Sequence, residues 1–260
     1  DSDWSSDVCS SDLMANRIDI LAKITEWLEP QNFQDYAPNG LQVEGKEDVN
    51  TIITGVTASQ ALLDEAIKHN ADMILVHHGY FWKGEDQCIR GMKKNRIKQL
   101  LENDINLVAY HLPLDDHPEY GNNRQLADVL EIQNPKPLGG LVWQGKLKEP
   151  MSPEKFGLHI ARALHRNPLR VGEGRDTIET VSWCTGAAQG FINMAIEANA
   201  DAYISGEISE PTTHTARECG IHYYAAGHHA TERYGVQALG EALAKEFGVS
   251  HQFIDCDNPV

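Results

Sequence analysis

The sequence predicts an α/β protein built from two similar α/β/α halves. Short apolar strands alternate with longer amphipathic helices, the same order of elements occurs twice, and 41% of the 260 residues are apolar. That apolar content is enough for a sizeable core. Strands that alternate with helices form parallel sheets covered on both faces, because right-handed crossovers place the helices there.

The first half is expected to span residues 14–124. An amphipathic helix over about 20–28 opens it, and a β-α-β train follows. The expected elements of that train are strands at 41–45, 49–55 and 73–76, a helix over about 59–69 before the third strand, and a later strand at 105–110.

The second half is expected to span residues 151–260. It offers helices over about 152–164, 189–198 and 233–247, and strands at 169–174, 178–186, 202–204, 221–226 and 251–255. The segment 125–150 is interpreted as the connection between the halves, because it is rich in proline and glycine and has little hydrophobic period.

Three matches in nearly constant register indicate an internal repeat. Leu41 and Leu169 are 128 residues apart, Gly55 and Gly186 are 131 apart, and the two Asn-Ala-Asp tripeptides that begin at Asn70 and Asn199 are 129 apart. A single shared tripeptide carries little information, but three in the same order predict a duplicated unit.

Residues 1–13 are expected to be a foreign leader. They are rich in Ser and Asp, have no helical or strand period, and precede Met14, where ordinary protein composition begins. Their four aspartates and lack of basic residues mean that leaving them out changes the formal net charge from −16 to −12.

The charge and the cysteines exclude several classes of function. An acidic chain without a basic stripe repels phosphate backbones, so we expect no nucleic-acid binding, whereas cation binding suits it. No apolar run approaches 18 residues and no signal region follows Met14, so we expect a cytoplasmic protein with no membrane span. The cysteines outside the leader form no CxxC pair, which argues against a disulfide framework or a zinc ribbon.

Polar side chains follow the expected strands at the points where ligands bind open parallel sheets. Two histidines follow the strand at 73–76, and similar residues follow three other strands. These strand-end residues are His77 and His78, His111 and Asp115, Glu207, and His228 and His229.

This residue set is typical of a metal site. Imidazole and carboxylate together favour zinc, iron or manganese, and a carboxylate can bridge two ions. His228 and Glu232 are four residues apart, a spacing that lets both reach one ion. Taken singly, a His-His pair or an HxxxE spacing is an ordinary surface or core feature; four such clusters at equivalent strand ends favour two adjacent divalent ions.

Five segments carry a resemblance to a known family. They are DYAPNGLQVEG (35–45), ILVHHGYFWKGE (74–85), YHLPLDDHPEYGNN (110–123), GEISE (206–210) and AGHHATERYG (226–235). In this order they closely resemble the Nif-three-like family over residues 14–260. The resemblance implies two interlocked α/β/α domains and a homo-oligomer, a ring-shaped hexamer whose metal sites face its interior.

The resemblance also implies a dinuclear metal site. Matched position by position, its ligands fall on His77, His78, Asp115, His228 and Glu232, with Glu232 as the bridge. Members of the family are commonly called GTP cyclohydrolase type 2 homologues.

Two functions fit these residues. The first is a metal-dependent hydrolase acting on a nucleotide-like or other small heterocyclic substrate, with His111, Glu207 or His229 moving protons or orienting ligands. The alternative is a non-enzymatic protein that handles or delivers metal. An open coordination position distinguishes them, because only the enzyme must admit water and substrate.

Overall fold

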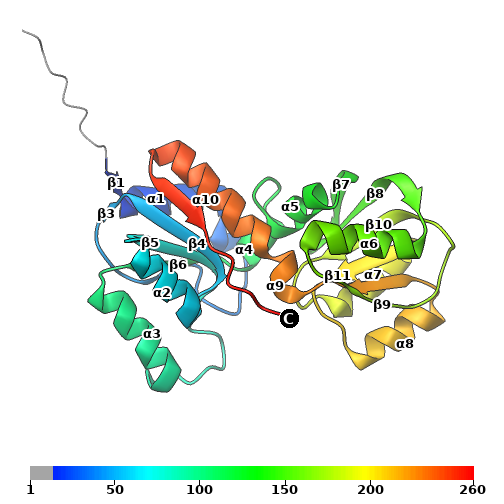
Figure 1. The fold of residues 1–260 in the computed structure, drawn as a ribbon, viewed down its shortest axis with the longest axis horizontal. Helices are drawn as coiled ribbons and strands as arrows, with labels where there is room; N and C mark the ends of the chain where they lie inside the picture. The colour runs from blue at the N-terminus through cyan, green and yellow to red at the C-terminus, as the bar shows by residue number, and fades with distance from the viewer. Residues whose placement is uncertain (1–13) are drawn as a thin grey trace, which may run out of the picture.

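The computed structural model describes residues 14–260, which form two α/β/α units lying side by side (Figure 1). The first unit contains a five-stranded sheet and the second a six-stranded sheet. The predicted fold class is therefore confirmed. The leader assigned to residues 1–13 lies outside the described residues.

The first sheet has strands in the order β13-β4-β5-β6-β2, with the edge strand β2 antiparallel to the rest. These strands are β2 (Gly40–Val43), β4 (Thr51–Thr57), β5 (Met73–His78), β6 (Asn106–Ala109) and β13 (Ser250–Phe253). The short pair β1 (Ala15–Asn16) and β3 (Asp48–Val49) lies beside it, and the turn η1 (Pro30–Asn32) follows the first helix.

Helices cover both faces of the first sheet. One face packs against α1 (Arg17–Leu28) and α10 (Arg233–Phe247), and the other against α2 (Gln60–Lys68) and α3 (Gly91–Glu102). On α1 the buried apolar positions, among them Ile20, Ile24 and Leu28, recur every four residues, so they form one stripe toward the sheet. The strands between the two helix layers are almost fully buried, as expected for a parallel sheet.

The second sheet has the order β7-β8-β10-β11-β12-β9. Its strands are β7 (Ile132–Gly139), β8 (Val142–Met151), β9 (Leu169–Val171), β10 (Ile178–Cys184), β11 (Ala202–Ser205) and β12 (His222–Ala225). One face carries α5 (Asn122–Val129) and α6 (Pro153–Leu164); the other carries α7 (Ile192–Glu197), the turn η2 (Gln189–Phe191) and α8 (Glu210–Glu218).

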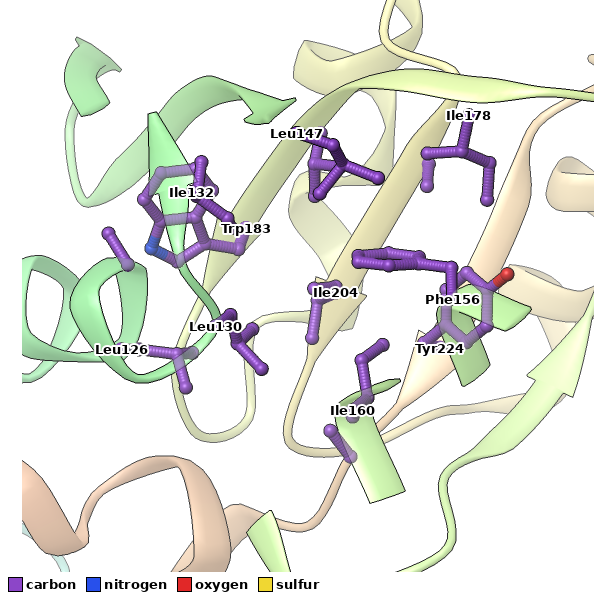
Figure 2. Close-up of a cluster of buried hydrophobic side chains, with 14 of the residues drawn as sticks. Leu126, Leu130, Ile132, Leu147, Phe156, Ile160, Ile178, Trp183, Ile204 and Tyr224 are labelled. Carbon is purple, nitrogen blue, oxygen red and sulfur yellow. The ribbon is translucent and has the colours of Figure 1, made fainter. Parts of the chain in front are cut away.

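Figure 2 shows the core beneath α5 and α6. Trp183 on β10, Phe156 on α6 and Tyr224 on β12 are fully buried there. The polar atoms of the two larger rings are satisfied, since Trp183 Nε1 donates to Asn123 O at 2.9 Å and Tyr224 Oη donates to Pro153 O at 2.8 Å. This core therefore also ties α5 and the start of α6 to the sheet.

The two units contain elements in the same order, β-β-α-β. In each sheet three parallel strands, β4-β5-β6 and β10-β11-β12, are followed by an antiparallel edge strand, β2 or β9. The Asn-Ala-Asp tripeptides have the same structural role in both. Asn70 and Asn199 take φ values of 52° and 54°, which asparagine tolerates at a helix end.

The aspartate of each tripeptide then holds the start of the preceding strand. Asp72 accepts hydrogen bonds from the amides of Asn50 and Thr51 at 2.8 and 2.9 Å. Asp201 accepts them from Glu179 and Thr180 at 3.0 and 2.8 Å. The repeat seen in the sequence thus reflects one turn and one strand anchor, used twice.

The expected boundaries need two corrections. Residues 125–150 are not a plain connection, because they contain the end of α5 and the hairpin β7-β8. Pro135 and Pro137 were interpreted as loop residues, but β7 is an edge strand, where proline is tolerated.

The second correction concerns α10 and β13, which the sequence placed in the second half, 151–260. α10 packs against the first sheet through Val236, Leu239 and Leu243, and β13 pairs in parallel with β4. The end of the chain therefore crosses back and completes the first unit (Figure 1). This crossing is what interlocks the two units.

Two short helices, α4 (Leu112–Asp116) and α9 (His228–Thr231), follow β6 and β12 and lead into the region between the units. Within residues 14–260 the longest helix has 15 residues, and none is long and apolar enough to span a bilayer.

Candidate metal centre

The polar strand ends of the two sheets meet between the two units. β5 ends in His77 and His78, α4 carries Asp115 just beyond β6, and His228 begins α9 with Glu232 directly after that helix. Because the carboxyl ends of the parallel strands point the same way, side chains from distant parts of the sequence converge here. Their nitrogen and oxygen atoms form overlapping groups with the spacing of metal ligands.

The first group consists of His77, Asp115 and Glu232, all of them buried. His77 Nε2 lies 3.4 Å from Asp115 Oδ1 and 3.6 Å from Glu232 Oε1. The other ring nitrogen, Nδ1, lies 3.0 Å from the carbonyl oxygen of Tyr110. That contact fixes a proton on Nδ1 and directs Nε2 toward the two carboxylates.

The second group consists of His78, His228 and Glu232. Glu232 Oε2 lies 3.2 Å from His78 Nε2 and 3.1 Å from His228 Nε2. Glu232 thus offers one carboxylate oxygen to each group.

The geometry fits metal ligation better than hydrogen bonding. Two ligands about 2.0–2.1 Å from a tetrahedral ion lie roughly 3.3–3.4 Å apart, and the four distances here run from 3.1 to 3.6 Å. Charge-assisted hydrogen bonds are shorter, about 2.7–2.9 Å. Within residues 14–260, Glu232 Oε2 is moreover a buried oxygen without a well-formed hydrogen bond. A buried carboxylate oxygen in that state needs a cation.

The electrostatics of the site also favour a cation. Burial by itself lowers the pKa of His77 and of His228, but the neighbouring carboxylates outweigh it and raise each to about 9. Burial lowers the pKa of His78 to about 4, helped by the two adjacent histidines. Burial would raise the pKa of Glu232, but the imidazoles around it hold that pKa well below its usual range. Protons on imidazole therefore balance a buried anionic site, and metal binding would displace them.

A shell of hydrogen bonds orients the candidate ligands. Asp115 Oδ1 accepts from Asn122 Nδ2 at 2.9 Å and from Thr185 Oγ1 at 3.3 Å. His228 Nδ1 lies 2.6 Å from Glu207 Oε1. The sequence singled out Glu207 but missed Asn122 and Thr185, because an amide and a hydroxyl without a spacing signature look like ordinary helix and loop residues.

His111 lies beside the cluster and is held by a buried carboxylate. Its ring centroid is 5.1 Å from that of His77, and its Nδ1 lies 2.6 Å from Asp35 Oδ1. Asp35 also accepts from Asn39 Nδ2 at 2.9 Å and from the amide of Leu112 at 2.9 Å. Asp35 was not a predicted site residue, since it lies 76 positions from His111 in the chain.

His229 has a different environment from the other strand-end histidines. Its Nε2 lies 2.7 Å from Asp255 Oδ1, just beyond β13, and its amide donates to Val260 O at 3.0 Å. Asp255 also pairs with Arg233 at 3.0 Å. His229 thus fastens the last residues of the chain to α9, next to the cluster.

A small cavity of about 150 Å³ reaches the second ligand group. Thr57, His78, His228 and Asn258 contribute to its walls. The cluster is therefore accessible from one side, at a point where two candidate ligands are only partly covered.

Fold and site together define an α/β protein with a cluster of histidines and carboxylates able to hold metal. A family model for Duf34/NIF3 (NGG1p interacting factor 3) matches residues 15–259. The chain belongs to this family, as the resemblance predicted.

Proteins of similar sequence match this chain along nearly its whole length. A Pseudomonas aeruginosa protein called "GTP cyclohydrolase 1 type 2 homolog" is 56% identical over 92% of this chain and 97% of its own length. A protein of the same name from Escherichia coli K12 is 54% identical over 91% of this chain and 96% of its own length. Among solved structures, protein ybgI, described as of unknown function, superposes with a TM-score of 0.92 at 52% identity, covering 95% of this chain and all of its own.

The Asp35–His111 pair predicts a pH-dependent contribution to stability. Burial raises the pKa of Asp35, but hydrogen bonds from His111 and Asn39 outweigh it and lower that pKa to about 2. Because the pKa of Asp35 in the folded protein lies below its ordinary value of 3.8, the contribution is present above about pH 4 and lost as pH falls toward 2. We expect Asp35→Asn to lower the free energy of unfolding by about 1–2 kcal/mol at pH 7. Denaturant unfolding of the metal-free protein measures this difference in the free energy of unfolding. A difference equally large at pH 2.5 would contradict the role assigned to the Asp35–His111 pair.

Proposed function

We propose that this protein is a dinuclear metal-dependent hydrolase. The observation that carries the proposal is the position of Glu232, whose two oxygens each face a separate pair of candidate ligands. One pair is His77 and Asp115, and the other is His78 and His228. The mixed imidazole and carboxylate set suits two divalent ions of iron, zinc or manganese.

When bound, a pair of such ions supplies Lewis acidity and lowers the pKa of water toward neutrality. The protein's own residues then have to hold the ions, admit the substrate and move protons. Asn122 and Thr185 fix the direction of Asp115, and Glu207 fixes the tautomer of His228. These contacts hold the ligand set in place before any metal arrives.

His111 is the best placed residue for proton transfer. Asp35 holds its Nδ1, which directs Nε2 away from Asp35 and leaves that nitrogen to exchange a proton. Glu207 is a positioning residue for His228 in this proposal. His229 is proposed to act through the end of the chain, since its imidazole contacts Asp255.

The substrate class is proposed from the relatives. Their name refers to GTP cyclohydrolase, an activity on a purine nucleotide, and we propose a nucleotide-like or other small heterocyclic substrate for this chain. We further propose that the protein acts in the cytoplasm as a homo-oligomer, a toroidal hexamer.

The alternative is a metal-handling protein that performs no reaction. The burial of the first ligand group favours it. Asp115 and Glu232 are only 5% and 2% exposed, and His77 is fully buried. The cavity at His78 and His228 favours the hydrolase, since a storage site has no need of room beside its ligands.

Metal-loaded protein incubated with a pool of nucleotides and heterocyclic cofactors tests the proposal directly. Mass spectrometry should show at least one species consumed and a product heavier by the elements of water, or its cleavage fragments. The metal-free protein is the control. No consumption with any of the three metals, together with release of metal to a chelating acceptor protein, would support the alternative instead.

His111→Gln separates proton transfer from metal binding. We expect turnover of the substrate so found to fall by a factor of about 10²–10⁴, with the metal content unchanged. Elemental analysis after gel filtration and a turnover assay on one sample measure both. Loss of metal in this variant would show instead that His111 is a ligand, as its place in a group with His77 and His78 allows.

A further inference from the structure

We propose that a pocket beside the metal centre binds a planar heteroaromatic ring of the substrate by stacking on Trp82. The inference rests on the proposed function and names the part of the substrate that this pocket would hold. The pocket, here called the Trp82 pocket, is a cavity of about 370 Å³ formed mainly by Phe81, Trp82, Lys83, Glu85, Gln87 and Lys93. Its volume lies in the range of small-molecule sites.

Trp82 connects this pocket to the metal centre. Its ring centroid lies 5.0 Å from that of His111, at an interplanar angle of 86°, and 5.9 Å from that of His78. The ring of Tyr36 also approaches His111, edge-on at 6.3 Å, and Tyr36 is 62% exposed. Two aromatic side chains thus lie against the histidine proposed to transfer protons.

The loop that carries Trp82 is held in place by specific contacts. Gln42 Oε1 accepts from the amide of Tyr80 at 2.7 Å, and Gln42 Nε2 donates to the carbonyl oxygen of Tyr80 at 3.1 Å. The amide of Lys83 donates to Tyr36 O at 2.6 Å, which joins this loop to the segment bearing the second ring. Trp82 Nε1 donates to Gly79 O at 3.2 Å, so the indole is fixed at its polar end and keeps its faces for packing.

The backbone at the base of the pocket is strained. Phe81 has a φ of 64°, a left-handed conformation that is unusual for a bulky aromatic residue. Its ring is 36% exposed and lies 4.9 Å from the ammonium group of Lys93. Strain of this kind persists only where surrounding contacts enforce it, and it gathers at ligand-binding sites. Phe81 here lies against Lys93, and Trp82 lies against His78 and His111.

The chemistry of the pocket selects flat, unsaturated rings. An indole held at its edge offers a rigid surface on which any heteroaromatic ring stacks, whichever hydrogen-bonding groups that ring carries. A ring on Trp82 would lie next to His111 and His78, so its reactive atoms would be within reach of the metal centre. A sugar or an aliphatic acid gains less from this surface, because it has no π system to overlap with the indole.

Calorimetric titration of the metal-loaded protein tests the proposal without any need for turnover. The probes are guanosine, riboflavin and nicotinamide, with ribose as the non-aromatic comparison. We expect at least one of the three rings to bind, ribose not to bind, and Trp82→Leu to weaken the ring's affinity by about tenfold. Trp82→Phe keeps an aromatic ring at this position and should lose much less affinity for the probe. Trp27→Leu is the matched control, because Trp27 lies on α1 and packs against Tyr120.

Metal content is measured on every variant, so that a damaged metal centre is not mistaken for a lost stacking surface. Full metal content with affinity lowered only at Trp82 would support the proposal. Absence of binding by all three rings, or equal affinity in Trp82→Leu and the unsubstituted protein, would overturn it. Neither result would bear on hydrolysis, which the consumption assay tests separately.

Discussion

The Glu232→Gln protein is expected to lose most of its metal, both ions together, while staying folded. Glutamine keeps the size of the side chain but removes the negative charge that faces His77, His78 and His228. A neutral amide also presents only one oxygen, so it cannot serve both ligand groups. We expect metal affinity to fall on the order of 100-fold or more. Substitution of residues that only orient the ligands already lowers metal affinity by about 10- to 100-fold.

The fold should survive because core packing holds the strands that carry the remaining ligands. Elemental analysis after gel filtration gives the metal content, and circular dichroism gives the fold. His229→Gln serves as the control. Because this histidine contacts Asp255, its substitution should cause a far smaller loss of metal. Two ions retained in Glu232→Gln, or equal losses in both variants, would mean that the ligands are wrongly assigned.

Gly186→Ala is the second variant with a large expected effect. Gly186 follows β10 with a φ of 69°, and a β-carbon at this position would overlap Glu232 Oε1 and lie 3.2 Å from His228 Nε2. The added methyl group must therefore push the Glu232 carboxylate out of place. We expect metal affinity to fall at least tenfold and the free energy of unfolding to fall by about 2–4 kcal/mol, from backbone strain and overpacking together.

A matched control separates the two causes. Gly248 has the same φ of 69°, at the end of α10, but a β-carbon there meets nothing within 4 Å. Gly248→Ala should therefore show the backbone strain alone, about 1–2 kcal/mol, with full metal content. Equal metal content in the two variants would show that Gly186 does not support Glu232.

The periodic parts of the fold were predictable from local patterns. Buried strands and amphipathic helices leave a signature because each must bury one face, and the second Asn-Ala-Asp tripeptide marked a repeated turn and strand anchor. The hairpin β7-β8 was missed because its prolines and glycines resemble a loop. Nothing local distinguishes a loop from an edge strand whose amide groups are not all paired.

The convergence of these histidines and carboxylates was largely predictable for a topological reason. Parallel strands bring their carboxyl ends to one edge, so polar residues just after each strand converge whatever their separation in sequence. That rule placed His77, His78 and Asp115 in one half and His228 in the other. It does not reach Asp35, which precedes the edge strand β2, or Asn122, which starts α5.

By itself, the sequence determined the fold class, the repeated path of the strands and the residue types that gather at their ends, because periodicity and strand polarity are local properties of the chain. Only the tertiary structure decided which unit α10 and β13 complete, and that Asp35 holds His111. These features depend on contacts between residues far apart in the chain. Their free energy comes from burial and packing of the whole molecule, for which no short segment carries a signature.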